Sequence, residues 1–250
     1  KPEGKRKRPL APAKPTPIRA NRVGEVLRKM FNLAIKWKMR DDNPASGFRR
    51  NPENEKEYFL TEPEIDRLAA ALAEDADQRG AAIIRMCMLT GARLGEVRCA
   101  RFDQFNLDLM YWLKQASGTK QRKVHRAPIS EAVVAIVRER RAAVPAGCPW
   151  LFPGDAEGKD QPVQDLRKFW ARIRKKAGLP EVCRIHDLRH TFASLVAGDG
   201  ASLLMIGKLL GHSQMKTTQR YAHLVDAPLR SKVNTVAEIV KPRLRVVASG

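Results

Sequence analysis

The 250-residue sequence has no apolar run that could cross a bilayer. Its strongest apolar runs, such as SLLMIG, fall far short of the roughly 18 residues that a membrane span needs. The basic N-terminal stretch KPEGKRKRPLAPAKP is followed by no apolar signal core, so nothing in the pattern indicates secretion. We therefore expect no membrane partner and a cytoplasmic location.

Cysteine is scarce and scattered. The four cysteines, Cys87, Cys99, Cys148 and Cys183, lie far apart and form no CxxC pair. Such spacing predicts neither a zinc knuckle nor a disulfide framework. We expect four reduced thiols packed in the core.

Acidic residues are also few. The chain has 27 Asp and Glu against 47 Lys and Arg, a net charge of +20, and its pI is close to 10.3. A folded domain with such an excess is expected to bind a polyanion, and nucleic acid is a better candidate than an anionic membrane surface. Residues 1–56 contain 16 basic and 6 acidic residues, so this short part carries half of the net charge.

Residues 1–56 are expected to contain a basic arm, one helix and a linker. Lysine, arginine and proline fill residues 1–18, which predicts a solvated arm rather than packed structure. Residues 19–40 place apolar side chains at helical spacing with basic residues between them. One helix cannot bury such a stripe alone, so we expect it to close a truncated domain. Residues 40–57 then form a polar linker.

A second body is predicted from residue 57 to residue 225, followed by a tail at 226–250. Thr61, with Glu64 three residues later, predicts a capping box at the start of a helix. Two helices should follow, separated by a break near Gly91. YWLKQ and RKVHRAPI predict a hairpin of two strands. The expected fold class is mainly α with a small antiparallel sheet, and its further helices are predicted at 130–143, 162–177, 187–198, 202–210 and 214–223.

Residues 184–224 contain four of the five histidines and one of the three tyrosines. HDLRH resembles the zinc motif HExxH, but Arg189 lies between His186 and His190, where its charge would repel a cation. The pair His186 and Arg189, one turn apart, suits a phosphate better, because Arg offers forked donors and His moves a proton near neutral pH. Asp187 as N-cap would leave a helix N-terminus beside them. A surface Arg beside a capping His explains these residues, taken alone, equally well.

Six elements occur here in one order: an Arg in TGARLGEV, a Lys in SGTKQ, the H-x-x-R pair, a His in LGH and a Tyr nine residues later. Together they resemble the tyrosine recombinases of the phage-integrase family over about residues 57–225. The resemblance implies the fold of that family's DNA breaking-rejoining catalytic domain. It also implies a set of catalytic residues: Arg93, Lys120, His186, Arg189, His212 and Tyr221.

The resemblance implies a site-specific recombinase or integrase that cuts and rejoins DNA through a covalent 3′-phosphotyrosyl intermediate, without metal or cofactor. Tyrosine suits this reaction because its aryloxide leaves more easily than a serine alkoxide. A phenol is ionised to only about one part in a thousand at pH 7, so neighbouring groups must help Tyr221 to react. By the resemblance, Arg93 and Arg189 would clamp the non-bridging phosphate oxygens.

Four further roles follow from the same resemblance. Lys120 would protonate the departing 5′ oxygen, and Lys123 is its rival for that role. His186 would assist proton transfer at the tyrosine, and His212 would hydrogen-bond the phosphate. Glu96, one turn after the first arginine, is expected to brace the site rather than react.

The resemblance implies double-stranded DNA as partner and a homotetramer on two DNA sites, in the bacterial cytoplasm, with a monomer in free solution. A helix near residues 229–240 is expected to dock on a neighbouring subunit. Two alternatives stay open. A type IB topoisomerase shares the chemistry, and ASLLMIGKLLGHSQMKTTQRYAHL also resembles a helix-turn-helix of a non-catalytic DNA-binding protein.

Other polar and aromatic residues are given supporting roles. Tyr58 and Tyr111 are expected to be packing residues. His190 and His223 are expected to support the neighbouring catalytic positions. His125 alternates along a strand and is expected to face solvent or a phosphate. The six basic residues of 162–177 are read either as a solvated face or as phosphate contacts.

Overall fold

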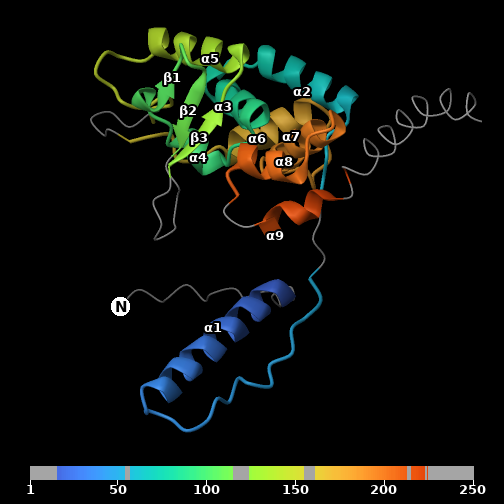
Figure 1. The fold of residues 1–250 in the computed structure, drawn as a ribbon. Helices are drawn as coiled ribbons and strands as arrows, with labels where there is room; N and C mark the ends of the chain where they lie inside the picture. The colour runs from blue at the N-terminus through green and yellow to red at the C-terminus, as the bar shows by residue number, and fades with distance from the viewer. Residues whose placement is uncertain are drawn as a thin grey trace, which may run out of the picture. The chain divides into compact units, whose positions relative to one another are not determined.

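The computed structural model describes residues 16–53, 57–114, 124–154, 161–212, 215–222 and 224. The chain divides into two units at the junction of residues 56 and 57. The first unit contains a single long helix, α1 (Pro17–Lys36), drawn in blue in Figure 1. The second unit contains the other helices and a small sheet.

The segment that follows α1 packs against this helix. Asn21 is fully buried, and its Nδ2 donates to the Asn51 carbonyl at 2.9 Å while its Oδ1 accepts from the Asn51 N–H at 2.8 Å. Gly24 leaves room for the ring of Phe48, which a Cβ would approach to 2.5 Å. The predicted polar linker, over its described residues 40–53, forms no helix and packs against α1 through Phe48 and Asn51.

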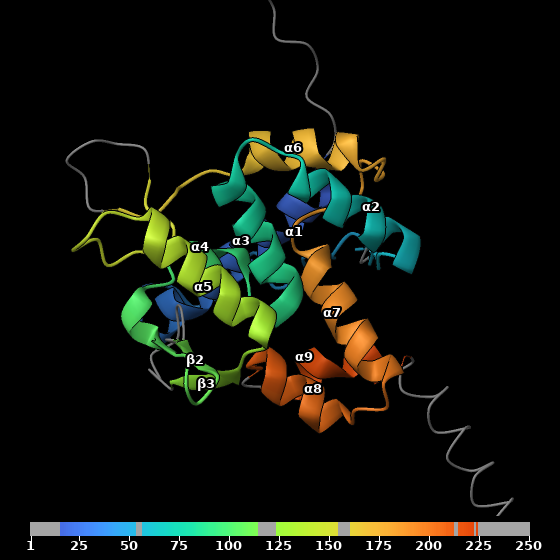
Figure 2. The same ribbon diagram turned by 90° about the horizontal axis from the view of Figure 1, so that it is seen from above.

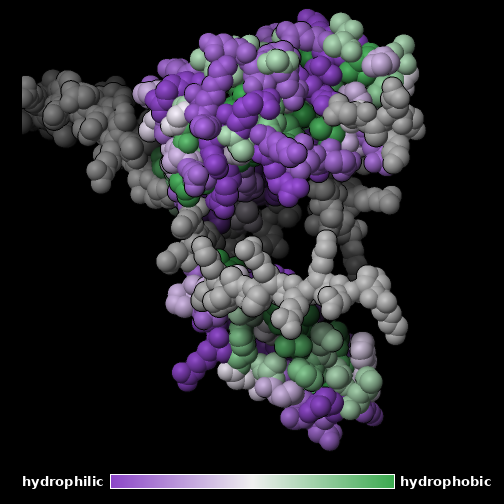
Figure 3. Space-filling view, turned by 180° about the vertical axis from the view of Figure 1, so that it is seen from behind, coloured by the Kyte–Doolittle hydropathy of each residue, from purple (hydrophilic) through white to green (hydrophobic). Residues whose placement is uncertain are grey.

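Another side of α1 exposes apolar side chains. Val23, Val26, Leu27 and Met30 are between 42% and 58% exposed, and Figure 3 shows green apolar surface on this unit. Among the described residues of its own unit, this stripe has no apolar cover. A single helix cannot bury its own stripe, and apolar patches of this kind are typical of surfaces that pack against another part of a protein.

The second unit is organised around α3 (Gln78–Thr90), whose residues are buried on most sides. A helix that is apolar all round belongs in a core. The helices α2, α5 and α7 pack against α3, and α6 packs against α2 (Figure 2). Their bounds are α2 (Glu62–Ala73), α5 (Glu131–Ala143), α6 (Arg167–Lys176) and α7 (Asp187–Gly198). Within the described ranges, no helix has both the length and the apolar character needed to cross a membrane.

Local sequence explains where the first helices of this unit begin and end. Before α2, the Glu64 carboxylate accepts from the backbone N–H of Thr61 at 2.9 Å, as the capping box predicted. α3 ends at Gly91, whose φ of +60° is strained for any residue with a side chain. A Cβ there would also lie 2.5 Å from Phe192. The predicted break is thus confirmed, and α4 (Leu94–Arg98) follows it.

The sheet has three antiparallel strands in the order β1-β2-β3. They are β1 (Phe105–Asn106), β2 (Tyr111–Lys114) and β3 (His125–Pro128). Trp112 of β2 is buried and pairs with Phe105 and Ala127. Lys114, two residues later, points to the same buried side because side chains alternate along a strand. The hairpin of β2 and β3 is confirmed, whereas β1 was not predicted.

The helix α6 is shorter than the predicted helix 162–177. Residues 161–166 run without helix, and Pro162 forms a bridge with Pro153. Proline also disfavours helical geometry in the residue that precedes it. Three of the six basic side chains form ion pairs with acids, namely Arg167 with Asp165, Arg172 with Asp75 and Lys176 with Glu74. Half of this basic face is thus locally neutralised.

The last described elements form a second apolar cluster. They are α8 (Leu203–Leu210), α9 (Met215–Thr218) and the 3-10 turn η2 (Gln219–Tyr221). Across the described residues 215–222 the chain is helical, as predicted for 214–223, but it changes from α-helix to the 3-10 turn η2 at Gln219–Tyr221 before residue 222 returns to α-helix. Side chains from α7, α8 and η2 pack together in this cluster, which consists of Ala193, Ala197, Ile206, Leu210 and Tyr221.

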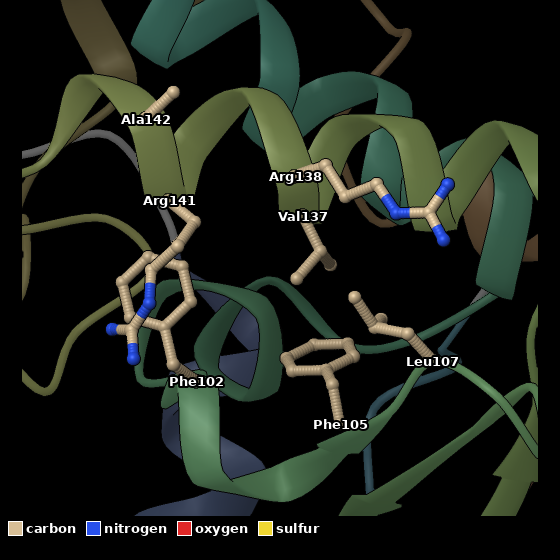
Figure 4. A pocket seen from close by; sticks show the side chains of 7 residues that line it. All are labelled: Phe102, Phe105, Leu107, Val137, Arg138, Arg141 and Ala142. Carbon is tan, nitrogen blue, oxygen red and sulfur yellow. The ribbon is translucent and has the colours of Figure 1, made fainter.

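An apolar pocket lies between the 3-10 turn η1 (Phe102–Gln104), β1 and α5. The guanidinium of Arg141 lies 4.4 Å from the centre of the Phe102 ring, as Figure 4 shows. The pocket is lined by Phe102, Phe105, Leu107, Val137, Arg138, Arg141 and Ala142. None of the predicted site residues that the structure describes lines it.

The four cysteines are free, but they are not all core residues. Cys87 and Cys183 are buried, and Cys148 is half-buried. Cys99, the residue that ends α4, is exposed. The prediction of four core thiols is wrong for this residue, because a short helix ends at the surface there.

The start of α7 depends on a buried carboxylate. Asp187 is fully buried, and its Oδ2 accepts from the backbone N–H of Arg184 at 2.7 Å while Oδ1 accepts from its guanidinium at 3.0 Å. Asp187 was expected to be the N-cap. His186 occupies that position instead, and Asp187 is the first helical residue, whose side chain closes the preceding turn.

We expect Asp187→Asn to lower the free energy of unfolding by about 1–3 kcal/mol, because buried donors lose a charged acceptor. Denaturant unfolding followed by circular dichroism measures this difference. Asp199→Asn, at the exposed far end of the same helix, is the matched control and should change the free energy by less than about 0.5 kcal/mol. Equal effects of the two substitutions would contradict the role given to the buried carboxylate.

Candidate active site

Arg189 lies at the centre of the candidate site and is only 3% exposed. Its Nη1 donates to the Gly91 carbonyl at 2.7 Å, and its Nη2 donates to the Leu210 carbonyl at 2.9 Å. These carbonyls end α3 and α8, so one guanidinium joins three helices. Burial, followed by the charge of Arg93, lowers the pKa of Arg189 to about 10.

Arg93 is the N-cap residue of α4, and its side chain is 46% exposed. Its Nη1 donates to Glu96 Oε1 at 2.9 Å, and its backbone N–H donates to Oε2 at 3.1 Å. The carboxylate thus holds both the backbone and the guanidinium of Arg93. Burial raises the pKa of Glu96, but the charges of Lys114 and Arg93 outweigh it and keep this pKa below its usual value.

Lys114 supports the same carboxylate from β2. Its Nζ lies 3.6 Å from Glu96 Oε2, and its side chain is only 4% exposed. Among the described residues, Nζ has no hydrogen-bond partner. Burial lowers the pKa of Lys114 to about 8, against the opposing effect of the Glu96 charge.

His186 precedes α7 and His212 follows α8, and the charge of Arg189 acts on both rings. His186, the N-cap residue of α7, is exposed, and partial desolvation, followed by the charge of Arg189, lowers its pKa. His212 follows α8, and its Nδ1 lies 2.8 Å from Oγ1 of the buried Thr218. Burial lowers the pKa of His212 to about 4, so the ring is neutral at pH 7. If the hydroxyl donates to Nδ1, the ring proton is on Nε2, which becomes a donor for a ligand.

Tyr221 lies in η2 and is 1% exposed. Its Oη is 2.9 Å from Nδ1 of His190, which is itself 3% exposed. Burial raises the pKa of Tyr221, whereas the charges of Arg189 and Arg93 lower it. The phenol is thus buried within the field of both guanidiniums.

The structure brings the predicted residues of α4, α7, α8 and η2 to one place. Arg93, Arg189 and Tyr221 act on one another electrostatically, and Glu96 and His212 belong to the same group. The predicted acid Lys120, its rival Lys123 and the supporting residue His223 lie outside the described residues.

Three residues of the site were missed or given too small a role by the sequence analysis. His190 was read as a supporting residue, yet it bonds the phenol directly. Lys114 was not singled out, although its place two residues after the buried Trp112 was a signal in the alternating strand. Thr218 had no signal in the sequence, because only packing brings it to His212.

His125 also differs from its prediction. It was expected to face solvent or a phosphate, and the first alternative is wrong, because the ring is half-buried and its Nε2 lies 2.6 Å from the carbonyl oxygen of Lys208. The following turn at Gly211 has a φ of +69°, and a Cβ there would lie 2.6 Å from His125 Nδ1. β3 therefore packs against the end of α8 through this ring.

The side chains of the site are suited to binding an anion. Two guanidiniums, a buried ammonium and neutral imidazoles are donors, as a phosphodiester requires. Within the described ranges, no three His, Cys, Asp or Glu side chains converge as metal ligands.

The pKa of His190 makes a pH-dependent prediction. Burial, followed by the charge of His186, lowers it to about 4 from the usual 6.5, so the folded protein binds fewer protons than the unfolded chain between these values. The native free energy of unfolding should therefore fall by about 3 kcal/mol, relative to His190→Asn, as the pH drops from 6.5 to 4. Denaturant titrations of both proteins at several pH values measure it, and parallel pH profiles would contradict it.

Comparison with known proteins identifies the family to which the chain is similar. The model of the phage integrase family matches residues 58–227. The integrase of Haemophilus phage HP1 is 31% identical over 221 residues, which cover 88% of this chain and 60% of that protein. The integrase of Escherichia phage P2 is 30% identical over 220 residues, covering 87% and 59% respectively. The chain spans about three fifths of the length of these relatives.

Solved structures agree at the level of the fold. The catalytic domain of the HP1 integrase is 28% identical and covers 72% of this chain and 95% of that domain, with a TM-score of 0.55. The XerA recombinase is 26% identical with a TM-score of 0.58, covering 89% of this chain and 85% of that one. The chain therefore belongs to the phage integrase family, and its second unit has the fold of the family's catalytic domain.

Proposed function

We propose that this protein is a site-specific DNA recombinase that cuts and rejoins strands through a covalent bond between Tyr221 and a 3′-phosphate. One observation carries the proposal: Tyr221 packs in one cluster with Leu210, whose carbonyl accepts from the Arg189 guanidinium, so the phenol and this guanidinium lie on either side of the same residue. Relatives at 30–31% identity are named integrases, and the transposon integrase of Tn1549, which shares the fold, was solved with transposon DNA.

The two guanidiniums divide the work of binding a phosphate. Arg189 is fixed by two helix-end carbonyls, so its remaining N–H groups have a set direction. Arg93 is half-exposed and braced by Glu96, which leaves it accessible to DNA. Donors fixed before the reaction stabilise the charge of a pentacoordinate phosphorus without reorganising. His212 adds a neutral donor to a phosphate oxygen.

The reaction conserves the number of phosphate ester bonds. The Tyr221 oxygen attacks phosphorus and loses its proton, with His186 assisting the transfer. The bond between phosphorus and the 5′ oxygen breaks, and Lys120 gives that oxygen a proton. The products are a 3′-phosphotyrosine and a 5′-hydroxyl. The 5′-hydroxyl of another strand then attacks the phosphotyrosine and releases the phenol, so rejoining needs no external energy source.

The partners are part of the same proposal. Double-stranded DNA is the substrate, and a homotetramer on two DNA sites performs the exchange, in the cytoplasm of a bacterium. Residues 226–250 would dock on a neighbouring subunit, and they lie outside the described residues. The helix α1 would close a core-binding domain, and its uncovered apolar stripe supports this.

The non-catalytic alternative fits the geometry less well. A helix-turn-helix needs a second regular helix whose side chains reach into the major groove. Here α9 ends after four residues, and Tyr221 points into the protein. A type IB topoisomerase would share the cleavage step, and an assay of strand exchange between two labelled duplexes distinguishes it from a recombinase.

The covalent step has a direct test. We expect the native protein to form an SDS-resistant adduct with lightly nicked genomic DNA of its source organism, and sequencing of the trapped ends identifies the site. Tyr221→Phe should form no adduct, because no oxygen remains to attack phosphorus, and should still bind duplex in a mobility-shift assay. DNA binding by the native protein without any adduct would support the non-catalytic alternative.

The proton donor can be identified with the DNA site found in this way. Lys120→Ala should slow cleavage of ordinary DNA by about 10²–10⁴-fold, the usual contribution of a positioned acid. A substrate with sulfur in place of the bridging 5′ oxygen should restore most of the rate, because a thiolate leaves without a proton. Lys123→Ala is the matched control and should show neither effect. The reverse pattern would assign the role to Lys123.

A further inference from the structure

We propose that His190 is a positioning residue for the nucleophile: it binds the Tyr221 hydroxyl in the DNA-free protein and keeps it buried until DNA occupies the site. This inference rests on the proposed function of Tyr221. The sequence analysis assigned assistance at the tyrosine to His186 and only a supporting role to His190. The phenol bonds His190 in the DNA-free protein, which adds a holding role beside the proton transfer proposed for His186.

The contact joins two buried groups. Nδ1 of His190 lies 2.9 Å from Oη of Tyr221, and the ring centres are 5.9 Å apart. The two residues are 3% and 1% exposed. A buried polar group that loses its only partner is costly, so this hydrogen bond holds the phenol in place. His186 contacts His190 edge to face, with ring centres 5.0 Å apart.

A phenol in this position cannot attack DNA. The whole residue is only 1% exposed, so a phosphorus atom in a duplex, surrounded by its own oxygens and sugars, cannot reach the phenol oxygen. The ring is enclosed by apolar side chains of α7 and α8, including Ala193, Ala197, Ile206 and Leu210. Cleavage therefore requires the tyrosine to leave this cluster, and leaving it breaks the hydrogen bond to His190.

The elements around the contact differ in rigidity. His190 is on α7, a twelve-residue helix that also carries Arg189 and packs on the core helix α3. Tyr221 is on η2, three residues of 3-10 helix after a four-residue α9. Short 3-10 segments have poorer hydrogen-bond geometry and reorganise at low cost. The tyrosine side of the contact is thus the one that moves.

The state of both groups agrees with a holding role. Burial, followed by the charge of His186, lowers the pKa of His190 to about 4, and burial raises the pKa of Tyr221. At neutral pH the imidazole is therefore uncharged, so its Nδ1 can accept from the phenol, which keeps its proton. A protonated, buried phenol is a poor nucleophile, so the DNA-free protein is protected from reacting with stray phosphates.

The holding contact is tested first without DNA. N-acetylimidazole acetylates accessible tyrosine hydroxyls, and peptide mass spectrometry measures each tyrosine separately. His190→Leu should be acetylated about tenfold faster at Tyr221, the effect of removing one buried hydrogen-bond partner. His190→Asn, whose amide can occupy the position of Nδ1, should stay within about twofold of the native rate. Tyr58 and Tyr111 are internal references and should not change.

An unchanged rate at Tyr221 in the leucine variant would overturn the proposal. Faster acetylation of all three tyrosines would indicate unfolding, and His190→Gln, which keeps a polar side chain but places its amide away from Nδ1, then replaces the leucine variant with the same expected result. Equal rates in the glutamine variant and the native protein would overturn it too.

The second measurement uses the trapped DNA site. In a single turnover, His190→Leu should form the adduct several-fold faster than the native protein, because less of the tyrosine is held back. A slower rate would overturn the holding role and would instead make His190 a proton acceptor in the reaction. If the native protein forms no adduct at all, the proposed function fails, but the acetylation rates still decide whether His190 holds the phenol.

Discussion

The buried guanidinium of Arg189 is the interaction on which the arrangement of the site depends. Its two bonds to the carbonyls of Gly91 and Leu210 connect the end of α3, the start of α7 and the end of α8. The turn after Gly91 presents Arg93, and the turn after α8 leads through His212 toward the tyrosine. A planar group with several fixed donors can join these ends at once, which a lysine cannot do. Stability and phosphate binding therefore share one side chain.

Much of the fold could be predicted from local signals. The capping box at Thr61, the glycine break at position 91 and the hairpin of β2 and β3 follow from short-range chemistry. The structure differs from the predictions where long-range packing decides. Phe48 returns to Gly24 of α1, and the helix expected at 214–223 changes to a 3-10 turn at Gln219–Tyr221, where Tyr221 packs into the apolar cluster. Neither contact has a periodic pattern in the sequence.

The candidate site was predictable in its residue types but not in its contacts. The order of motifs identified Arg93, Arg189 and Tyr221 without any coordinates, and these residues lie together. The sequence could not show that His190, one turn after the N-cap His186, bonds the phenol. It also hid Lys114, whose ammonium becomes part of the site only because the strand turns it inward. Such roles depend on the direction of side chains, which spacing alone does not fix.

The ion pairs along α6 have a consequence for how this protein senses ionic strength. Each phosphate neutralised by a free Lys or Arg releases about 0.9 counterions from a DNA duplex, and this release sets the slope of affinity against salt. Arg167, Arg172 and Lys176 already have carboxylate partners, so they have less charge to offer to DNA. The count of 47 basic residues therefore overstates the number of phosphates that the chain can neutralise. Its affinity should decline with added salt less steeply than a count of basic residues suggests.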